Sequence, residues 1–164
     1  MSYPMQLIRS TGLQFLTLGC GGNGKMQPHF AEILCDANVD AFVFDVFSNP
    51  TSEIIAERLF PFIEKIRSAH PEVPLIFQQT IYRERRSFDQ KYMEKERTKQ
   101  ELAARLMKEA RKKYNNVYFI QTNATDDLHS TSVDGSHPND YGYTLWAESI
   151  EKPLLKILKK HGIK

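Results

Sequence analysis

The stretch ANVDAFVFDVFSNPTSEIIAERLFPFIEKIRSA (residues 37–69) joins a short apolar run to an amphipathic pattern. Residues 37–47 are rich in Val and Phe, which favour a strand buried on both faces, as in a parallel sheet. Residues 51–69 carry apolar side chains three and four positions apart, which predicts a helix. Asn49, Thr51 or Ser52 would cap this helix. The stretch therefore predicts a strand followed by a helix that crosses over the sheet.

The same alternation continues on both sides of this stretch. Pro is preferred at the first position of a helix, so Pro28 predicts a helix that starts near Gln27. Strands that alternate with helices indicate an α/β sandwich around a parallel sheet. The further apolar runs that predict strands are 13–19, 72–79 and 115–121, and the further helical patterns are 89–114 and 141–160.

The composition of the chain narrows the class of protein. A length of 164 residues suits one domain, here 1–164, and 41% hydrophobic with 26% charged residues is ordinary for a globular protein. A net charge of +2 does not predict a nucleic-acid partner. Cys20 and Cys35 are too few for a disulfide framework or a four-cysteine metal site. No apolar run predicts a membrane span, and MSYPMQLIRS (1–10) lacks the layout of a signal peptide, so the compartment stays open.

The glycine-rich stretch LGCGGNGKM (residues 18–26) permits several interpretations. Gly19, Gly21 and Gly24 match the dinucleotide-binding pattern G-x-G-x-x-G, with an acidic Asp45 further along. The stretch from Gly19 to Lys25 also matches the start of a phosphate-binding P-loop, although Met follows the Lys where the motif needs Ser or Thr.

The expected helix start at Pro28 argues against both nucleotide interpretations of this stretch. Each nucleotide motif begins its helix inside the glycine run, so that the helix N-terminus meets the phosphates. A loop that extends to Gln27 instead allows a glycine N–H to approach a substrate oxygen, as half of an oxyanion hole. A simple strand-to-helix turn without a function is the remaining interpretation.

The stretch VDGSHPND (residues 133–140) places Asp134 three positions before His137. An aspartate that accepts a hydrogen bond from a histidine would supply two of the three members of a hydrolase triad, the third being the nucleophile. Pro138 biases His137 toward extended geometry, and Gly135 eases the turn that lets the two side chains meet. The structural alternative is an Asx-type turn with an exposed histidine.

Taken together, these loops resemble the signatures of the SGNH (GDSL-like) hydrolases, and the resemblance runs along essentially the whole chain. The second signature glycine matches Gly22 in LGCGGNG, and the third signature asparagine matches Asn49 in FDVFSNP. The family usually has Gly-x-Asn-Asp at the third signature, and this chain lacks that glycine. The last signature, Asp-x-x-His-Pro, matches DGSHP at 134–138. The chain is most similar to a bacterial subgroup of acyl- and acetylhydrolases.

The resemblance implies a flavodoxin-like three-layer α/β/α fold and a serine esterase or acylhydrolase that requires no cofactor. His137 would be the general base, and Asp134 would orient it. The Gly22 N–H and the Asn49 amide would form the oxyanion hole. The implied substrates are small-molecule carboxylic esters, including acetyl esters on carbohydrates. The rival interpretations are a nucleotide- or phosphate-binding module that uses the Gly19–Lys25 loop and a catalytically inert interaction domain.

The nucleophilic serine of the family has no counterpart in this sequence. The family carries it in a Gly-Asp-Ser or Gly-x-Ser signature after the first strand, and no such motif occurs here. The segment MSYPMQLIRSTG (1–12) matches the helix that follows that signature. The resemblance therefore places the nucleophile upstream of Met1, in a shortened or fragmentary chain, or implies a naturally inactive relative. The serines near the signatures that match no motif are Ser2, Ser48, Ser130, Ser132 and Ser136.

A missing first strand has a structural consequence. That strand is central in the flavodoxin-like order, so the predicted strands at 13–18 and 40–46 would face each other across a gap. We expect the two strands to pair directly, another chain to fill the gap, or the chain to form oligomers there. A metal site formed by Cys20, His29 and His137 stays open, although no ligand pair has a recognised spacing. The other histidines, His70, His129 and His161, suggest no role beyond a place for His129 near the rim of the site.

Overall fold

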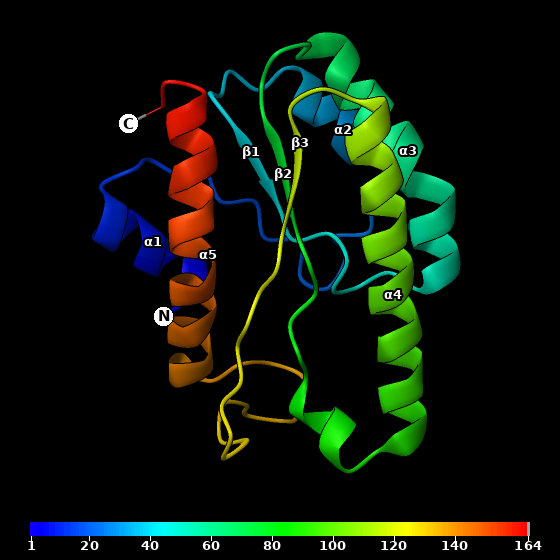
Figure 1. The fold of residues 1–164 in the computed structure, drawn as a ribbon, viewed down its shortest axis with the longest axis vertical. Coiled ribbons are helices and arrows are strands. Elements are labelled where there is room, and N and C mark those ends of the chain that lie inside the picture. Colours follow the sequence, from blue (N-terminus) through cyan, green and yellow to red (C-terminus); the bar gives the residue numbers. More distant parts are fainter. Residues whose placement is uncertain (164) are drawn as a thin grey trace. The chain divides into compact units, whose positions relative to one another are not determined.

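The structure is a computed structural model that describes residues 1–163, and Figure 1 shows its helices and strands. The chain divides into two compact units. The first unit comprises Met1–Gly19, Ile81–Arg97 and Gln121–Lys164. The second unit comprises Cys20–Thr80 and Thr98–Ile120.

The second unit contains a parallel sheet of three strands in the order β1-β2-β3. The strands are β1 (Phe42–Phe44), β2 (Leu75–Gln78) and β3 (Val117–Ile120). Both strand pairs are parallel. All four side chains of β2 are buried, as the continuous apolar run predicts for a strand with neighbours on both sides. Three of the four predicted strands and the α/β class are thereby confirmed.

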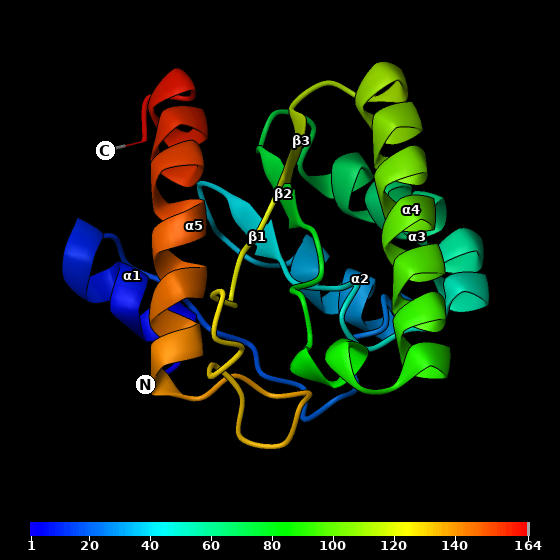
Figure 2. The same ribbon diagram turned by 60° about the horizontal axis from the view of Figure 1, so that its bottom comes forward.

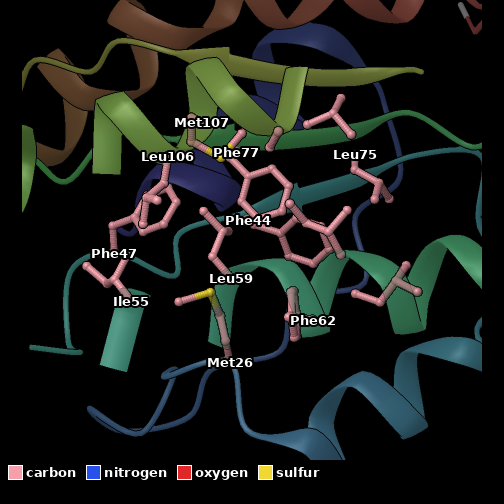
Figure 3. Close-up of a cluster of buried hydrophobic side chains, with 14 of the residues drawn as sticks. Met26, Phe44, Phe47, Ile55, Leu59, Phe62, Leu75, Phe77, Leu106 and Met107 are labelled. Atoms are coloured by element: carbon pink, nitrogen blue, oxygen red, sulfur yellow. The ribbon is translucent and has the colours of Figure 1, made fainter. Parts of the chain in front are cut away.

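Helices α2 (Pro28–Cys35), α3 (Ser52–Ala69) and part of α4 (Gln90–Lys113) pack with this sheet around one hydrophobic core. Figure 3 shows Phe44 and Phe77 at the centre of the core, with side chains of α3 and α4 around them. The ring centroids of Phe44 and Phe77 are 4.8 Å apart, and those of Phe47 and Phe77 are 6.0 Å apart. Since Phe47 lies two residues before Asn49, the core supports the loop that carries this candidate site residue.

The starts of α2 and α3 agree with the capping signals in the sequence. The Oγ1 of Thr51 accepts a hydrogen bond from the N–H of Ile54 at 3.4 Å, so Thr51 is the N-cap of α3. Gln27 is the N-cap of α2, and Pro28 is its first residue. Residues 19–27 therefore form a loop, as predicted.

The prediction of a strand at 13–19 is wrong for this structure. Residues 12–20 have no regular secondary structure, and the side chains of Leu16 and Leu18 are 77% and 55% exposed. A strand is defined by hydrogen bonds to a neighbouring strand, and within residues 1–163 no strand pairs with this segment. Strand β1 pairs only with β2 in the same part of the chain, so the expected direct pairing of 13–18 with 40–46 is absent.

The first unit contains α1 (Tyr3–Thr11), the short 3₁₀ helix η1 (Glu84–Ser87) and α5 (Asp140–Lys160). Helices α1 and α5 lie side by side in Figures 1 and 2. The rings of Tyr3 and Trp146 stack with centroids 4.3 Å apart, and the Oγ of Ser10 donates to Glu151 at 2.5 Å. Among residues 1–163, no helix combines the length and the apolar content that a bilayer crossing needs.

Candidate active site

The loop at residues 132–138 brings Asp134 and His137 together in the first unit. The Nδ1 of His137 donates to the Oδ2 of Asp134 at 2.7 Å. The Oδ1 of the same carboxylate accepts from the backbone N–H groups of Ser136 at 2.8 Å and His137 at 2.7 Å. The two interpretations of this stretch therefore coexist, because one oxygen forms the Asx-type turn and the other holds the imidazole.

A second set of hydrogen bonds closes the base of this loop. The Oγ of Ser132 donates to the carbonyl of His137 at 2.8 Å and accepts from the N–H of Gly135 at 2.8 Å. Ser132 and Pro138 also form an antiparallel bridge. Gly135 has a φ of +81°, which a residue with a Cβ rarely adopts, and a Cβ there would lie 3.2 Å from the Cβ of Arg85. The histidine is thus held on a loop with little conformational freedom.

The hydrogen bonds to Asp134 fix both its charge and the tautomer of its partner. The bond from the His137 ring, followed by those from the backbone N–H groups of His137 and Ser136, lowers the pKa of the Asp134 carboxyl well below its ordinary value of 3.8. An ionised Asp134 accepts the Nδ1–H, so the neutral imidazole keeps its lone pair on Nε2. Within residues 1–163, Nε2 has no hydrogen-bonding partner, and the side chain of His137 is 73% exposed. This nitrogen is available to accept a proton.

The lowered pKa predicts how the loop responds to acid. A carboxyl whose pKa is lower in the folded than in the unfolded state adds stability in full above the ordinary value of 3.8. That stability is lost progressively as the pH falls below this ordinary value, and the loss is complete once the pH has passed the lower, folded-state value. A ¹³C NMR titration of the Asp134 carboxyl is expected to give a midpoint below 3.8, which moves upward in His137→Ala. A wild-type midpoint at or above 3.8 would contradict the prediction.

Gly22 lies in the second unit, in an exposed turn of the glycine-rich loop. Its φ is +82°, and that of Gly21 is +52°, so the backbone here needs glycine. The N–H of Asn23 donates to the carbonyl of Cys20 at 2.9 Å and closes the turn. The N–H of Gly22 has no hydrogen-bonding acceptor among residues 1–163. This N–H is free to donate to an oxyanion.

Asn49 belongs to the same unit and lies beside the glycine-rich loop. A Cβ at Gly24 would be 3.9 Å from the Nδ2 of Asn49. The side chains of Phe47 and Pro50 are buried, whereas Asn49 is exposed between them. The Oγ of Ser48 donates to Asp45 at 2.7 Å, which further anchors the loop. The anchoring residues thus hold the backbone of Asn49 and leave its amide accessible.

The remaining candidates from the sequence do not extend this site. Ser48 and Ser132 use their hydroxyl groups in hydrogen bonds that stabilise loops. No serine hydroxyl in residues 1–163 bonds to the Nε2 of His137. In the same residues, no group of three or more His, Cys, Asp or Glu side chains is arranged to hold a metal ion, which leaves the Cys20–His29–His137 set without structural support.

The structure adds two features that the sequence did not predict. The N–H of Arg85, in η1, donates to the carbonyl of Gly135 at 2.8 Å, and the buried carboxylate of Glu84 bonds to the segment before the loop. An open depression of about 660 Å³ also adjoins the side chain of Asp134. Its lining residues are Arg85, Phe88, Asp89, Gln90, Lys91 and Asp134. Apart from Asp134, no local motif marks these residues, because they reach the loop only through tertiary contacts.

Solved structures share the fold described above. A Bacteroides ovatus protein described as a GDSL-like lipase is 39% identical, with a TM-score of 0.92 over 96% of this chain and 47% of its own. A salicylyl-acyltransferase of a tetracycline biosynthetic pathway has a TM-score of 0.73 at 20% identity over 95% of this chain and 49% of its own. An acetyl esterase mutant with acetate ion has a TM-score of 0.72 at 16% identity over 98% of this chain and 92% of its own.

These matches differ in how much of the other chain they cover. The chain spans about half the length of the first two similar structures and about nine tenths of the acetyl esterase. No curated protein matches the chain. Residues 1–155 match the GDSL-like Lipase/Acylhydrolase family, so the chain belongs to this family.

Proposed function

We propose that this chain carries the acid–base and oxyanion-binding parts of a serine ester hydrolase. The observation that carries the proposal is the His137–Asp134 pair, in which Nδ1 is bonded and Nε2 has no hydrogen-bonding partner within the described residues. The family membership and the α/β fold agree with this chemistry. No observation favours a nucleotide site, since α2 begins at Pro28 rather than within the glycine run.

Each side chain has a defined role in the proposed reaction. A serine Oγ attacks the ester carbonyl carbon while the Nε2 of His137 takes the serine proton. The carbonyl oxygen becomes an oxyanion, which the Gly22 N–H and the Asn49 amide stabilise. The imidazolium then gives its proton to the departing alkoxide, which leaves an acyl-enzyme and a free alcohol. Water repeats the sequence on the acyl-enzyme and releases the acid.

The proposed substrates are small carboxylic esters, including acetyl esters on carbohydrates. One of the similar structures is an acetyl esterase, and another is a carbohydrate esterase family 3 protein from Talaromyces cellulolyticus with a TM-score of 0.65 at 14% identity, over 98% of this chain and 92% of its own. The depression beside Asp134 combines the exposed ring of Phe88 with the polar side chains of Gln90 and Lys91. An apolar face with hydrogen-bonding groups beside it suits a sugar, whose C–H groups can lie on the aromatic ring while its hydroxyl groups bond to the polar side chains.

A fluorophosphonate probe tests the proposal and identifies the serine. The probe forms a covalent adduct with a serine that a neighbouring base activates. We expect one adduct by mass spectrometry in the longest form of the protein that contains residues 1–164, and none in His137→Ala. Absence of an adduct from wild-type protein, together with no hydrolysis of p-nitrophenyl acetate, would refute the proposal.

The oxyanion-hole assignment predicts a loss of kcat in Asn49→Ala. Removal of one oxyanion donor lowers kcat by about 10²- to 10³-fold, because the donor acts mainly in the transition state. The KM for p-nitrophenyl acetate is expected to stay within about 3-fold of the wild-type value, since ground-state binding is largely kept. The matched control is Asn38→Ala, an exposed asparagine of the same unit in a different loop. Equal kcat values for Asn49→Ala and Asn38→Ala would remove Asn49 from the site.

A further inference from the structure

Glu84 places a nearly buried carboxylate in the first unit, at the start of η1. Its side chain is only 7% exposed, and its carboxylate accepts hydrogen bonds from three other side chains. The Oγ1 of Thr131 donates at 2.8 Å, the Nδ1 of His129 at 2.7 Å, and the Oγ1 of Thr125 bonds to the same oxygen as Thr131. A buried charge is costly unless hydrogen bonds satisfy it, and here both carboxylate oxygens are bonded.

The partners of Glu84 lie directly before the loop that carries His137. Thr131 is buried, and its carbonyl accepts from the N–H of Asn139 at 2.9 Å, across the base of the loop. The next residue, Ser132, bonds to the carbonyl of His137. Glu84 therefore holds Thr131, the residue at which the hydrogen bonds across the base of the loop start.

The residue that follows Glu84 holds the same loop at its tip. The N–H of Arg85 donates to the carbonyl of Gly135, which lies between the aspartate and the histidine. The dipeptide Glu84–Arg85 thus contacts the loop at its base through a side chain and at its tip through the backbone. Figure 2 shows the segment that precedes α5, in yellow to orange, and η1 in green.

Little free space remains in the cavity beside Glu84. The cavity that touches both Glu84 and His137 has a volume of about 10 Å³, room for about one water molecule. A change in the position of the Glu84 carboxylate cannot be absorbed there without a shift of Thr131 or of the loop itself.

We propose that Glu84 is a positioning residue that sets the geometry of the His137–Asp134 pair through Thr131. The expected effect of Glu84 on catalysis rests on the proposed function, whereas its effect on the geometry of the loop does not. Within residues 1–163, no hydrogen bond joins Glu84 to the imidazole of His137, so Glu84 acts through the hydrogen bonds at the base of the loop.

NMR of ¹⁵N-histidine-labelled protein tests the proposal without an activity assay. The Nδ1–H proton of His137 reports the bond to Asp134 through its chemical shift and its exchange with water. We expect Glu84→Gln to shift this resonance and to speed its exchange at least about 10-fold, because the amide has only one accepting oxygen. The matched control is Glu96→Gln, which removes another buried glutamate of this unit whose carboxylate bonds to Arg83 at 2.8 Å.

Two substitutions of Thr131 distinguish a specific loss of the hydrogen bond from a general loss of structure. Thr131→Val keeps the shape of the side chain and removes the donor, so it should change the His137 resonance in the same direction as Glu84→Gln. Thr131→Ser keeps the hydroxyl donor, so its His137 resonance should stay close to that of the wild type. Folding of each variant is checked by circular dichroism. An unchanged His137 resonance in folded Glu84→Gln and Thr131→Val would overturn the proposal.

The kinetic consequence separates this inference from the proposed function. A small displacement of the base is expected to lower kcat for p-nitrophenyl acetate about 10²-fold in Glu84→Gln, with KM nearly unchanged. If His137→Ala leaves hydrolysis intact while Glu84→Gln shifts the resonance, the proposed function fails and the positioning role stands. If Glu84→Gln leaves the resonance unchanged while His137→Ala abolishes hydrolysis, the positioning role fails alone.

Discussion

Replacement of His137 with alanine is expected to lower kcat for p-nitrophenyl acetate by about 10⁴-fold or more. The variant loses the Nε2 that takes the serine proton, and a serine without a general base is a weak nucleophile at neutral pH. The structure supports this role because Asp134 holds Nδ1 at 2.7 Å and leaves Nε2 free within residues 1–163. The measurement is a kcat on the longest form of the protein that contains this chain.

Asp134→Asn extends this prediction to the orienting residue. An amide can donate toward Nδ1 and so favour the wrong tautomer, which is expected to lower kcat by about 10⁴-fold. The matched control for His137→Ala is His129→Ala, which removes a second histidine of the same unit whose Nδ1 also bonds to a carboxylate. We expect a much smaller loss for His129→Ala than for His137→Ala. Equal losses in the two histidine variants would mean that His137 is not the specific base.

Phe77→Ala is expected to have the largest effect on stability, a loss of about 3–5 kcal/mol in the free energy of unfolding. Phe77 is fully buried on β2, and its ring packs against those of Phe44 and Phe47 (Figure 3). The variant removes these contacts and leaves a cavity that the surrounding strands and helices cannot fill. Urea denaturation followed by circular dichroism measures the change.

The chain offers a matched control for this substitution. Phe88 is 76% exposed, so Phe88→Ala should change the free energy of unfolding by no more than about 0.5 kcal/mol. A loss below about 1 kcal/mol for Phe77→Ala would contradict the packing around β2. In Phe77→Ala, Phe47 also loses the ring that packs against it. Because Phe47 precedes Asn49 by two residues, this loss is expected to loosen the loop that presents the Asn49 amide.

Much of the second unit could be predicted from local patterns. Continuous apolar runs marked β1, β2 and β3, since strands with covered faces need apolar side chains on both sides. Pro28 marked the start of α2, and the candidates Asn49, Thr51 and Ser52 marked that of α3, because helix starts depend on residues a few positions apart. The run at 13–19 shows the limit of this reasoning. Its pattern is that of a strand, but a strand also needs a neighbour, and the described chain gives it none.

The Asp134–His137 pair could be predicted because its chemistry is local. The two residues are three positions apart, and a turn with Gly135 at positive φ brings the carboxylate to the imidazole. Gly22 could be singled out only through its match to the second signature of the family, and the positive φ that its backbone adopts became visible in the structure. The roles of Gly22 and Asn49 as oxyanion donors stay predictions that the kinetics above will test.

By itself, the sequence determined the elements that depend on neighbours along the chain: the buried strands, the helix caps and the Asp–His turn. The tertiary structure decided which distant groups support that turn. Glu84 meets Thr131 across 47 residues, and no pattern within one segment could show that a glutamate in a charged stretch would be buried there. Burial of a charge depends on donors that only the folded chain assembles, so its partners become visible only in the structure.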